Sequence, residues 1–135
     1  RADDPVAPQS WADVRALGNK GIILLNYDSS AIKRLNDLGG LSLDTTGQTI
    51  EINLKKLSNQ RGRFFYYPSA GVRAEMRQLG NSQQFRLIYP ALETVPFFLI
   101  AGKHLPSETL SRLQTAIQNS QKSGELQQIR SKWFN

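Results

Sequence analysis

The class of fold follows from one stretch of the chain, Gly21-Ile22-Ile23-Leu24-Leu25-Asn26-Tyr27-Asp28-Ser29-Ser30. Its first half is a continuous apolar run, which is typical of a strand buried on both faces, as in a parallel sheet. Its second half is polar, and the helical spacing of Ile32, Leu35 and Leu38 begins directly after it. The stretch therefore predicts one strand–helix unit of an α/β domain.

The same alternation extends in both directions. Upstream, Ser10 and Asp13 form a capping-box pattern for a helix that ends at Gly18. Residues 50–57 fit either a strand or a helix, and we take the helix because Lys55-Lys56-Leu57 continues its pattern. The other predicted elements are strands at 41–44, 64–67, 85–89 and 95–101, a helix capped by Ser69, a helix from about Ser107 and a helix after Gly124. Together they predict an α/β domain with a mostly parallel sheet flanked by helices.

Composition excludes several kinds of chemistry. The chain has 135 residues, which by length alone predicts one domain, and it has no cysteine. A disulfide scaffold, a thiolate metal site and a cysteine nucleophile are therefore excluded. The single histidine, His104, follows a predicted strand, and we expect it in a surface loop. The longest apolar run, residues 95–101, is too short to span a bilayer. We expect no metal, no cofactor and no catalytic residue.

Charge is distributed unevenly. The formal net charge is +6, and residues 1–60 hold seven basic and seven acidic residues, so the excess lies entirely in residues 61–135. A nucleic-acid surface is one interpretation of this asymmetry, and it predicts an affinity that falls steeply with salt. A solvated basic surface is the interpretation we favour, because the basic residues are scattered singly.

The order of these pieces resembles a known family. The features that carry the resemblance are the helix with Trp11, the apolar strand and Ser29-Ser30, the strand after Gly62-Arg63, and residues 96–103. The most specific feature is the ending Ser123-Gly124-Glu125-Leu126…Ile129…Lys132-Trp133-Phe134. From about residue 10 to 135, the chain resembles the second half of a bacterial extracytoplasmic solute-binding protein of family 3, the two-lobed amino-acid-binding type.

The resemblance implies a periplasmic binding protein-like fold of type II. Residues 1–9 would be a leader or linker, residues 10–94 a lobe-two-like α/β domain, and residues 95–135 the return strand and C-terminal helices of lobe one. The N-terminal half of lobe one has no counterpart here, so the resemblance implies a partial receptor. It also implies a periplasmic or other extracytoplasmic location and a small polar ligand held between two lobes. The partner would be an ABC-type membrane transporter or a signalling receptor.

The family presents hydroxyls and free backbone N–H groups from the loop after the first lobe-two strand. The matching residues are Asp28, Ser29 and Ser30, and they follow a predicted strand at the end where open α/β sheets bind ligands. Tyr67 and Ser69, near the end of a later strand, could offer further hydroxyls and an aromatic face. The alternatives are that Asp28 and Ser29 only cap a helix and that the aromatic run at 64–67 is sheet core.

Two departures from the family bear on the ligand. Asp28 would repel a carboxylate, so we expect a neutral or cationic ligand group. No acidic residue lies between Arg61 and Glu75, where the family's amino-acid binders carry aspartates. The resemblance therefore does not imply an ordinary amino-acid ligand.

Two other classes of function stay open beside a non-catalytic binding module. One is the substrate-binding half of an enzyme on the same fold, of the kind associated with dehydratases or lytic enzymes, which would need a general acid or base in the cleft. The other is a basic nucleic-acid-binding domain, which we do not favour. The helices after Ser107 carry apolar faces too large to leave in water, so we expect them to fold back or to pack in a homodimer or domain swap.

Overall fold

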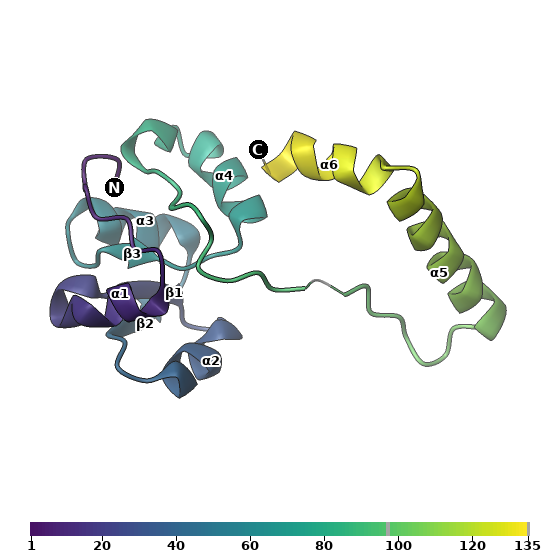
Figure 1. Cartoon of the computed structure of the whole chain (residues 1–135), viewed down its shortest axis with the longest axis horizontal. Helices are drawn as coiled ribbons and strands as arrows, with labels where there is room; N and C mark the ends of the chain where they lie inside the picture. Colours follow the sequence, from purple (N-terminus) through teal and green to yellow (C-terminus); the bar gives the residue numbers. More distant parts are fainter. Residues whose placement is uncertain (97, 135) are drawn as a thin grey trace. The chain divides into compact units, whose positions relative to one another are not determined.

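The computed structural model of the chain describes residues 1–96 and 98–134 (Figure 1). Length alone predicts one domain, but the chain divides into two compact units, Arg1–Glu93 and Thr94–Asn135, which we call unit 1 and unit 2. The division falls one residue before the boundary placed at 94/95 from the sequence. Each unit is described by itself below.

Unit 1 is an α/β unit built on a small open parallel sheet, which confirms the class predicted from the sequence. The strands are β1 (Ile23–Asn26), β2 (Leu43–Gly47) and β3 (Phe64–Phe65), in the order β2-β1-β3. Both outer strands pair in parallel with β1. The apolar run at 22–25 therefore forms the central strand, as expected of a segment buried on both faces.

Helices cover both faces of this sheet. They are α1 (Trp11–Ala16), α2 (Ala31–Leu38), α3 (Ile50–Ser58) and α4 (Ser69–Gln78), with 3₁₀ turns η1 (Gly18–Gly21) and η2 (Ser82–Gln84). The helical interpretation of residues 50–57 is thus correct. Local signals explain two of the starts. The Ser10 hydroxyl accepts from Asp13 N–H while the Asp13 carboxylate accepts from Ser10 N–H, and the Thr49 hydroxyl accepts from Ile52 N–H.

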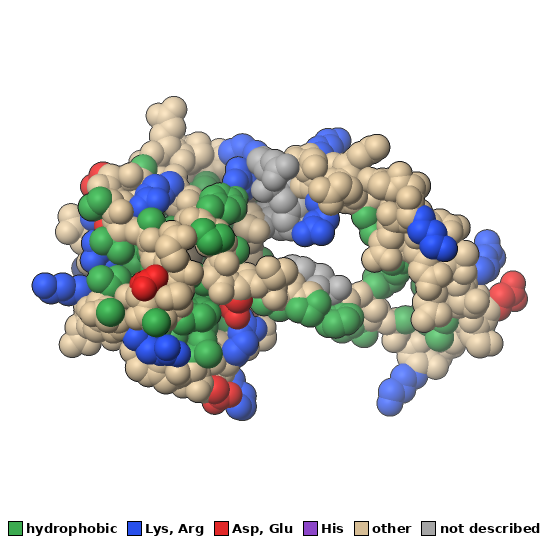
Figure 2. All heavy atoms as spheres, in the orientation of Figure 1, with side chains coloured by type: hydrophobic (Ala, Val, Ile, Leu, Met, Phe, Trp, Pro, Cys, Tyr) green, Lys and Arg blue, Asp and Glu red, His purple; other side chains and the backbone are tan. Residues whose placement is uncertain are grey.

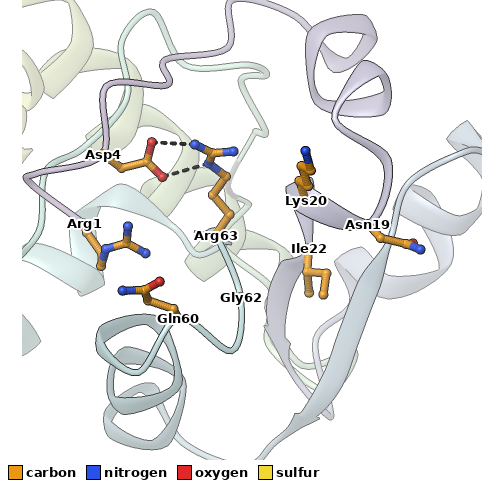
Figure 3. A pocket seen from close by; sticks show the side chains of 8 residues that line it. All are labelled: Arg1, Asp4, Asn19, Lys20, Ile22, Gln60, Gly62 and Arg63. Atoms are coloured by element: carbon orange, nitrogen blue, oxygen red, sulfur yellow. Dashed lines mark hydrogen bonds and ion pairs between the residues drawn. The ribbon is translucent and has the colours of Figure 1, made fainter.

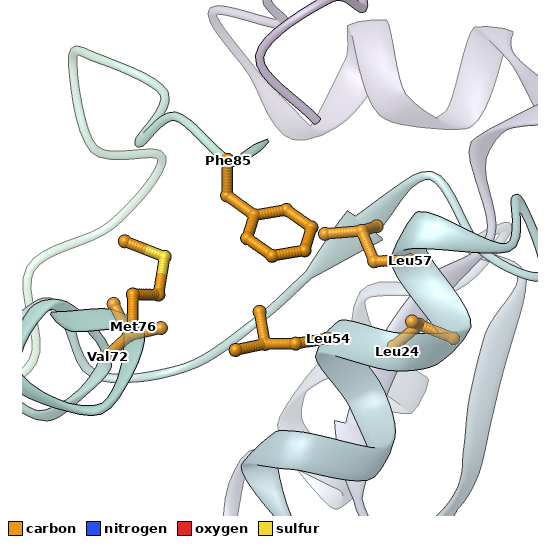
Figure 4. Close-up of a cluster of buried hydrophobic side chains, with 6 residues drawn as sticks. All are labelled: Leu24, Leu54, Leu57, Val72, Met76 and Phe85. Atoms are coloured by element: carbon orange, nitrogen blue, oxygen red, sulfur yellow. The ribbon is translucent and has the colours of Figure 1, made fainter. Parts of the chain in front are cut away.

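Two hydrophobic cores result, one on each face. Leu24 joins the core beside α3 and α4, shown in Figure 4, whereas Ile23 and Leu25 join the core beside α1 and α2. Successive side chains of β1 thus enter opposite cores, as the pleat of a strand requires. Leu24 and Leu25 are both fully buried. Because each core takes its side chains from β1, the position of this strand determines the packing on both faces.

The N-terminal segment 1–9 is irregular backbone that is attached to unit 1. The Asp4 carboxylate is buried and accepts two hydrogen bonds from the Arg63 guanidinium, both of 2.8 Å. Arg86 donates to the carbonyl oxygens of Asp4 and Val6, at 2.7 and 3.1 Å. Ala2 N–H donates to Gln84 O. The segment expected to be a leader or linker therefore binds unit 1 through Arg63, Gln84 and Arg86.

Two strand predictions are wrong. Residues 85–89 form no strand, and neither do the described residues of 95–101; Phe97 lies outside the described residues. Both runs have strand-like composition, but a strand exists only where a neighbour pairs with its backbone. No backbone hydrogen bond is formed by residues 94–96 or 98–101 within the described part of the chain. β3 is also shorter than the predicted 64–67, because only Phe64 and Phe65 pair with β1.

Unit 2 consists of this extended segment and two helices, α5 (Ser107–Lys122) and α6 (Glu125–Phe134), which start where the sequence predicted. Figure 2 shows hydrophobic side chains at the surface of this unit. Phe98, Leu99 and Ile100 are 69–90% exposed, and the apolar stripe of α5 is 37–39% exposed. The side chains of Trp133 and Phe134 lie outside the described part. Among the described residues, no helix is both long and apolar enough to cross a membrane.

Candidate functional site at the carboxyl edge of the sheet

The strand order places the candidate site. From β1 the chain crosses to β2 on one side and then to β3 on the other, so its winding reverses between β1 and β3. In open parallel sheets, the carboxyl ends of the strands at such a reversal diverge and leave a crevice for ligands. The carboxyl ends here are Asn26 in β1 and Phe65 in β3. The predicted site residues follow these two ends, Asp28, Ser29 and Ser30 after β1 and Tyr67 and Ser69 after β3. We call this region the carboxyl edge.

The loop after β1 is a tight turn leading into α2. Ser29 N–H donates to Asn26 O at 3.0 Å, and the Ser29 hydroxyl accepts from Ala31 N–H at 3.3 Å. Ser29 therefore binds a backbone donor of the first helical turn, as the capping alternative expects. Ser30, the N-cap residue, makes no side-chain capping bond. Asp28 is exposed, and within the described residues its carboxylate has no hydrogen-bond or ion-pair partner.

The two residues after β3 differ in environment. Tyr67 is half-buried, packs against the core beside α3 and α4, and has its ring 5.4 Å from that of Phe65. Its ring also lies against Gly71, where an added Cβ would be 3.0 Å from Tyr67 Cε1. Ser69 is exposed at the start of α4. The core alternative thus holds for much of the Tyr67 ring, while Ser69 is open to solvent.

A buried amide pair lies under the first loop. Asn53, on α3, is completely buried, and its Nδ2 donates to Asn26 Oδ1 at 2.8 Å. Gly47 lies opposite Asn26 across a register irregularity in β2, and a Cβ at Gly47 would overlap the Asn53 side chain. Gly47 O accepts from Tyr27 N–H at 2.9 Å. The amide pair and the glycine therefore fix the position at which β1 ends and the loop begins.

A charged network lies just beyond β3. Arg34 of α2 donates to the Tyr66 hydroxyl at 2.7 Å and to Glu93 at 2.6 Å, and the Tyr66 hydroxyl also donates to Glu93. Burial, reinforced by the bond to Glu93, raises the pKa of Tyr66 to about 12, so this hydroxyl remains a donor at neutral pH. Glu93 is the last residue of unit 1. The network thus attaches the end of unit 1 to α2 and to the residue after β3.

A second cation extends from α4. Arg73 donates to the Tyr89 hydroxyl at 2.6 Å, and its Nε is buried without a hydrogen-bond partner in the described residues. Arg73 lies one helical turn after Ser69 and therefore on the same side of α4. The carboxyl edge thus combines an unpaired carboxylate, hydroxyls and a guanidinium.

A hollow of about 260 Å³ lies at the opposite edge of the sheet (Figure 3). Its lining includes Ile22 and Gly62, which precede β1 and β3, and the Asp4–Arg63 ion pair. The hydrogen bonds from Arg63 hold the pKa of Asp4 down to about 2, so the pair is ionised at neutral pH. None of the predicted site residues lines this hollow. Because Arg1 and Asp4 of the N-terminal segment form part of its lining, we attribute it to the docking of that segment.

The described residues contain no cluster of acidic or histidine side chains that could hold a metal ion. His104 is exposed in a turn of unit 2, which confirms its prediction as a surface-loop residue.

The sequence motifs did not indicate a functional role for Asn26, Asn53, Arg34 or Glu93. A signal for Asn53 was present, because Ile50, Leu54 and Leu57 define the apolar face of α3 and Asn53 occupies a position on it. A polar residue on such a face needs a buried partner. The Arg34–Glu93 pair joins residues 59 apart, and no local pattern indicates it.

No family model, curated protein or solved structure matches this chain.

Proposed function

We propose that the chain is a ligand-binding part of an extracytoplasmic, periplasmic solute-binding protein with a type II fold. It would bind a small polar solute at the carboxyl edge without chemical conversion. A transporter of the ABC type or a signalling receptor would respond to the loaded protein. The observation that carries the proposal is the gathering of the predicted polar residues after neighbouring parallel strands, where the winding reverses.

The composition of the carboxyl edge supports a binding role. Asp28 and Ser30 are exposed beside the start of α2, and Ser69 is exposed at the start of α4. Because these residues are not used in the packing of unit 1, they are available to a solute. The proposal also includes further protein that completes the receptor. The exposed apolar segment and helices of unit 2 support this part of the proposal, because such surfaces usually bind a partner.

The charge of Asp28 defines the class of solute. An exposed carboxylate without a partner attracts an ammonium or a hydrogen-bond donor and repels a carboxylate. We therefore expect a neutral or cationic group to face the loop after β1.

Titration of the whole ¹⁵N-labelled chain with matched two-carbon solutes tests the proposal. Glycinamide and acetamide should shift the backbone amides of residues 27–30 and 67–69, and acetate should not. Concentrations up to roughly 50 mM are needed because ligands with so few atoms bind weakly. Asp28→Asn should remove the preference for glycinamide over acetamide, whereas Asp3→Asn, at the opposite edge, should leave it unchanged. Shifts absent for every solute, or confined to the hollow at the amino ends, would refute the proposal.

A further inference from the structure

The Nδ2 group of the Asn26 side chain is a hydrogen-bond donor that the described part of the chain does not use. Asn53 Nδ2 donates to Asn26 Oδ1, so that oxygen already accepts a hydrogen bond within the protein. Asn26 Nδ2 makes no hydrogen bond within the described residues. It is also not one of the polar atoms there that are both buried from solvent and without a partner. It is therefore a donor group with access to solvent at the last residue of β1.

The surroundings hold this donor in place. Asn53 is completely buried, and the absence of a Cβ at Gly47 makes room for its side chain. Asn26 is paired with Gly47 in the sheet, and its carbonyl oxygen accepts from Ser29 N–H. A side chain restrained by its backbone and by a buried partner loses little conformational entropy when it binds a ligand.

We propose that Asn26 is a further ligand-binding residue, which donates through Nδ2 to a carbonyl or hydroxyl oxygen, and that Asn53 is its positioning residue. This inference rests on the proposed function. With Asp28 two residues away, the site would accept a solute that carries an acceptor oxygen close to a cationic or donor group. A simple amine lacks that acceptor, and a carboxylic acid would be repelled by Asp28.

The first test needs no ligand and measures hydrogen exchange of the asparagine side-chain amides by NMR. Exchange at Asn53 should be roughly 100-fold slower than at exposed Asn36, because it requires local opening of α3. Exchange at Asn26 should resemble that at Asn36. Protection of the Asn26 side-chain amide to the same extent as that of Asn53 would mean that Asn26 donates to Asn53 and presents an oxygen to solvent, and it would overturn the proposal.

The second test compares glycinamide with ethylamine, which share an ammonium but differ in the carbonyl oxygen. The wild-type chain should prefer glycinamide, and Asn26→Asp should reduce that preference about fivefold, the value of one hydrogen bond. The aspartate keeps the acceptor for Asn53 and replaces the free amide by an oxygen. Taking the ratio of the two affinities cancels the general effect of the added charge.

Different results would refute the proposed function and the ligand role of Asn26. If neither amine binds, the proposed function is refuted and the ligand role of Asn26 with it. If both bind at the carboxyl edge and the ratio is unchanged in Asn26→Asp, only the role of Asn26 is refuted. Asn53→Ala separates positioning from stability, because it should reduce the glycinamide preference under conditions where the chain is still fully folded. An unchanged preference would refute the positioning role.

Discussion

Gly47 illustrates how a single residue depends on one neighbour in the next element, Asn53 of α3. A Cβ at Gly47 would lie 2.5 Å from Cγ of Asn53, whose side chain is buried and hydrogen-bonded. The backbone of Gly47 needs no left-handed conformation, since its φ is not positive. Glycine is therefore required here for space rather than for backbone freedom.

Gly47→Ala should accordingly lower the free energy of unfolding by roughly 1–3 kcal/mol, the usual cost of overpacking. Chemical denaturation measures this change. Asn53→Ala removes the atoms that the new methyl group would meet, so the double variant should be less destabilised than the sum of the single variants by about 1 kcal/mol. Strict additivity would show that the two side chains do not compete for the same space.

Asp4 gives the chain a defined dependence on pH. The hydrogen bonds from Arg63 lower the pKa of Asp4 from 3.8 to about 2 in the folded chain. Because the folded pKa lies below the unfolded value, the pair stabilises the fold fully above about pH 4 and is lost as the pH falls through about 2.

Asp4→Asn should therefore reduce the free energy of unfolding at pH 7 by up to about 2 kcal/mol. Near pH 2 the variant and the wild type should be equally stable. The matched control is Asp3→Asn, because the Asp3 side chain is 76% exposed and its ion pair with Arg1 contributes little. A difference between Asp4→Asn and wild type that persists unchanged at pH 2 would contradict the role of the ion pair.

Among the secondary-structure elements, α1 shows how a short helix is held by its first turn. It has only six residues, and isolated helices of that length are unstable in water. Both halves of its capping box are formed by Ser10 and Asp13, and Val14 is buried in the core beside α1 and α2. Local capping and one buried face therefore act together.

Ser10→Ala should destabilise the chain by about 1 kcal/mol, because it removes the acceptor for Asp13 N–H. Thermal or chemical unfolding followed by circular dichroism measures the effect. Ser30→Ala provides the comparison at the start of α2, where the serine makes no side-chain capping bond, and it should be nearly neutral. Equal losses in both variants would indicate that the serine at position 10 contributes through something other than its capping bond.

The elements that the sequence predicted well are those with local causes. The α1 capping box, the apolar run of β1 and the starts of α5 and α6 each depend on residues close together in the chain. The cap predicted at Ser69 is wrong, because Pro68 is the N-cap residue of α4 and no described side chain caps this helix. The strands predicted at 85–89 and 95–101 failed because pairing depends on a distant neighbour. The Asn26–Asn53 bond joins residues 27 apart and could be anticipated only from the polar residue on the apolar face of α3.

The candidate site also combines features with local causes and features that depend on distant residues. That Asp28 and Ser69 follow strands could be predicted, and parallel strands place their carboxyl ends at one edge. That β3 is next to β1, rather than beyond β2, is a property of the whole sheet. The charged network of Arg34, Tyr66 and Glu93 exists only because that order brings their segments together.

At the scale of the whole molecule, unit 2 exposes large apolar side chains on its first helix. Leu110, Leu113 and Ile117 form a stripe on α5, and each is more than a third exposed. Surfaces of this kind bind other proteins or other copies of the same chain. The expectation of a homodimer or domain swap therefore stays a prediction, and it can be tested on this stripe.

Light scattering should show that the mass of the wild-type particle increases with concentration. Leu113→Asp should weaken this association, since a charge in the stripe opposes burial. Gln114→Asp adds the same charge at the adjacent residue outside the stripe and should have little effect. A wild-type chain that is monomeric across the whole range, or equal effects of both variants, would show that the stripe does not mediate self-association.

The segment between Glu93 and α5 is also a covalent connection of limited length. Residues 94–106 separate Glu93 from the start of α5, and a chain of that length spans at most about 45 Å. Any protein bound to unit 1 therefore encounters α5 and α6 at an effective concentration in the millimolar range. A contact too weak to survive between separate molecules can still be occupied in such a complex. Cleavage after exposed Lys103 would abolish such a contact while leaving both helices intact.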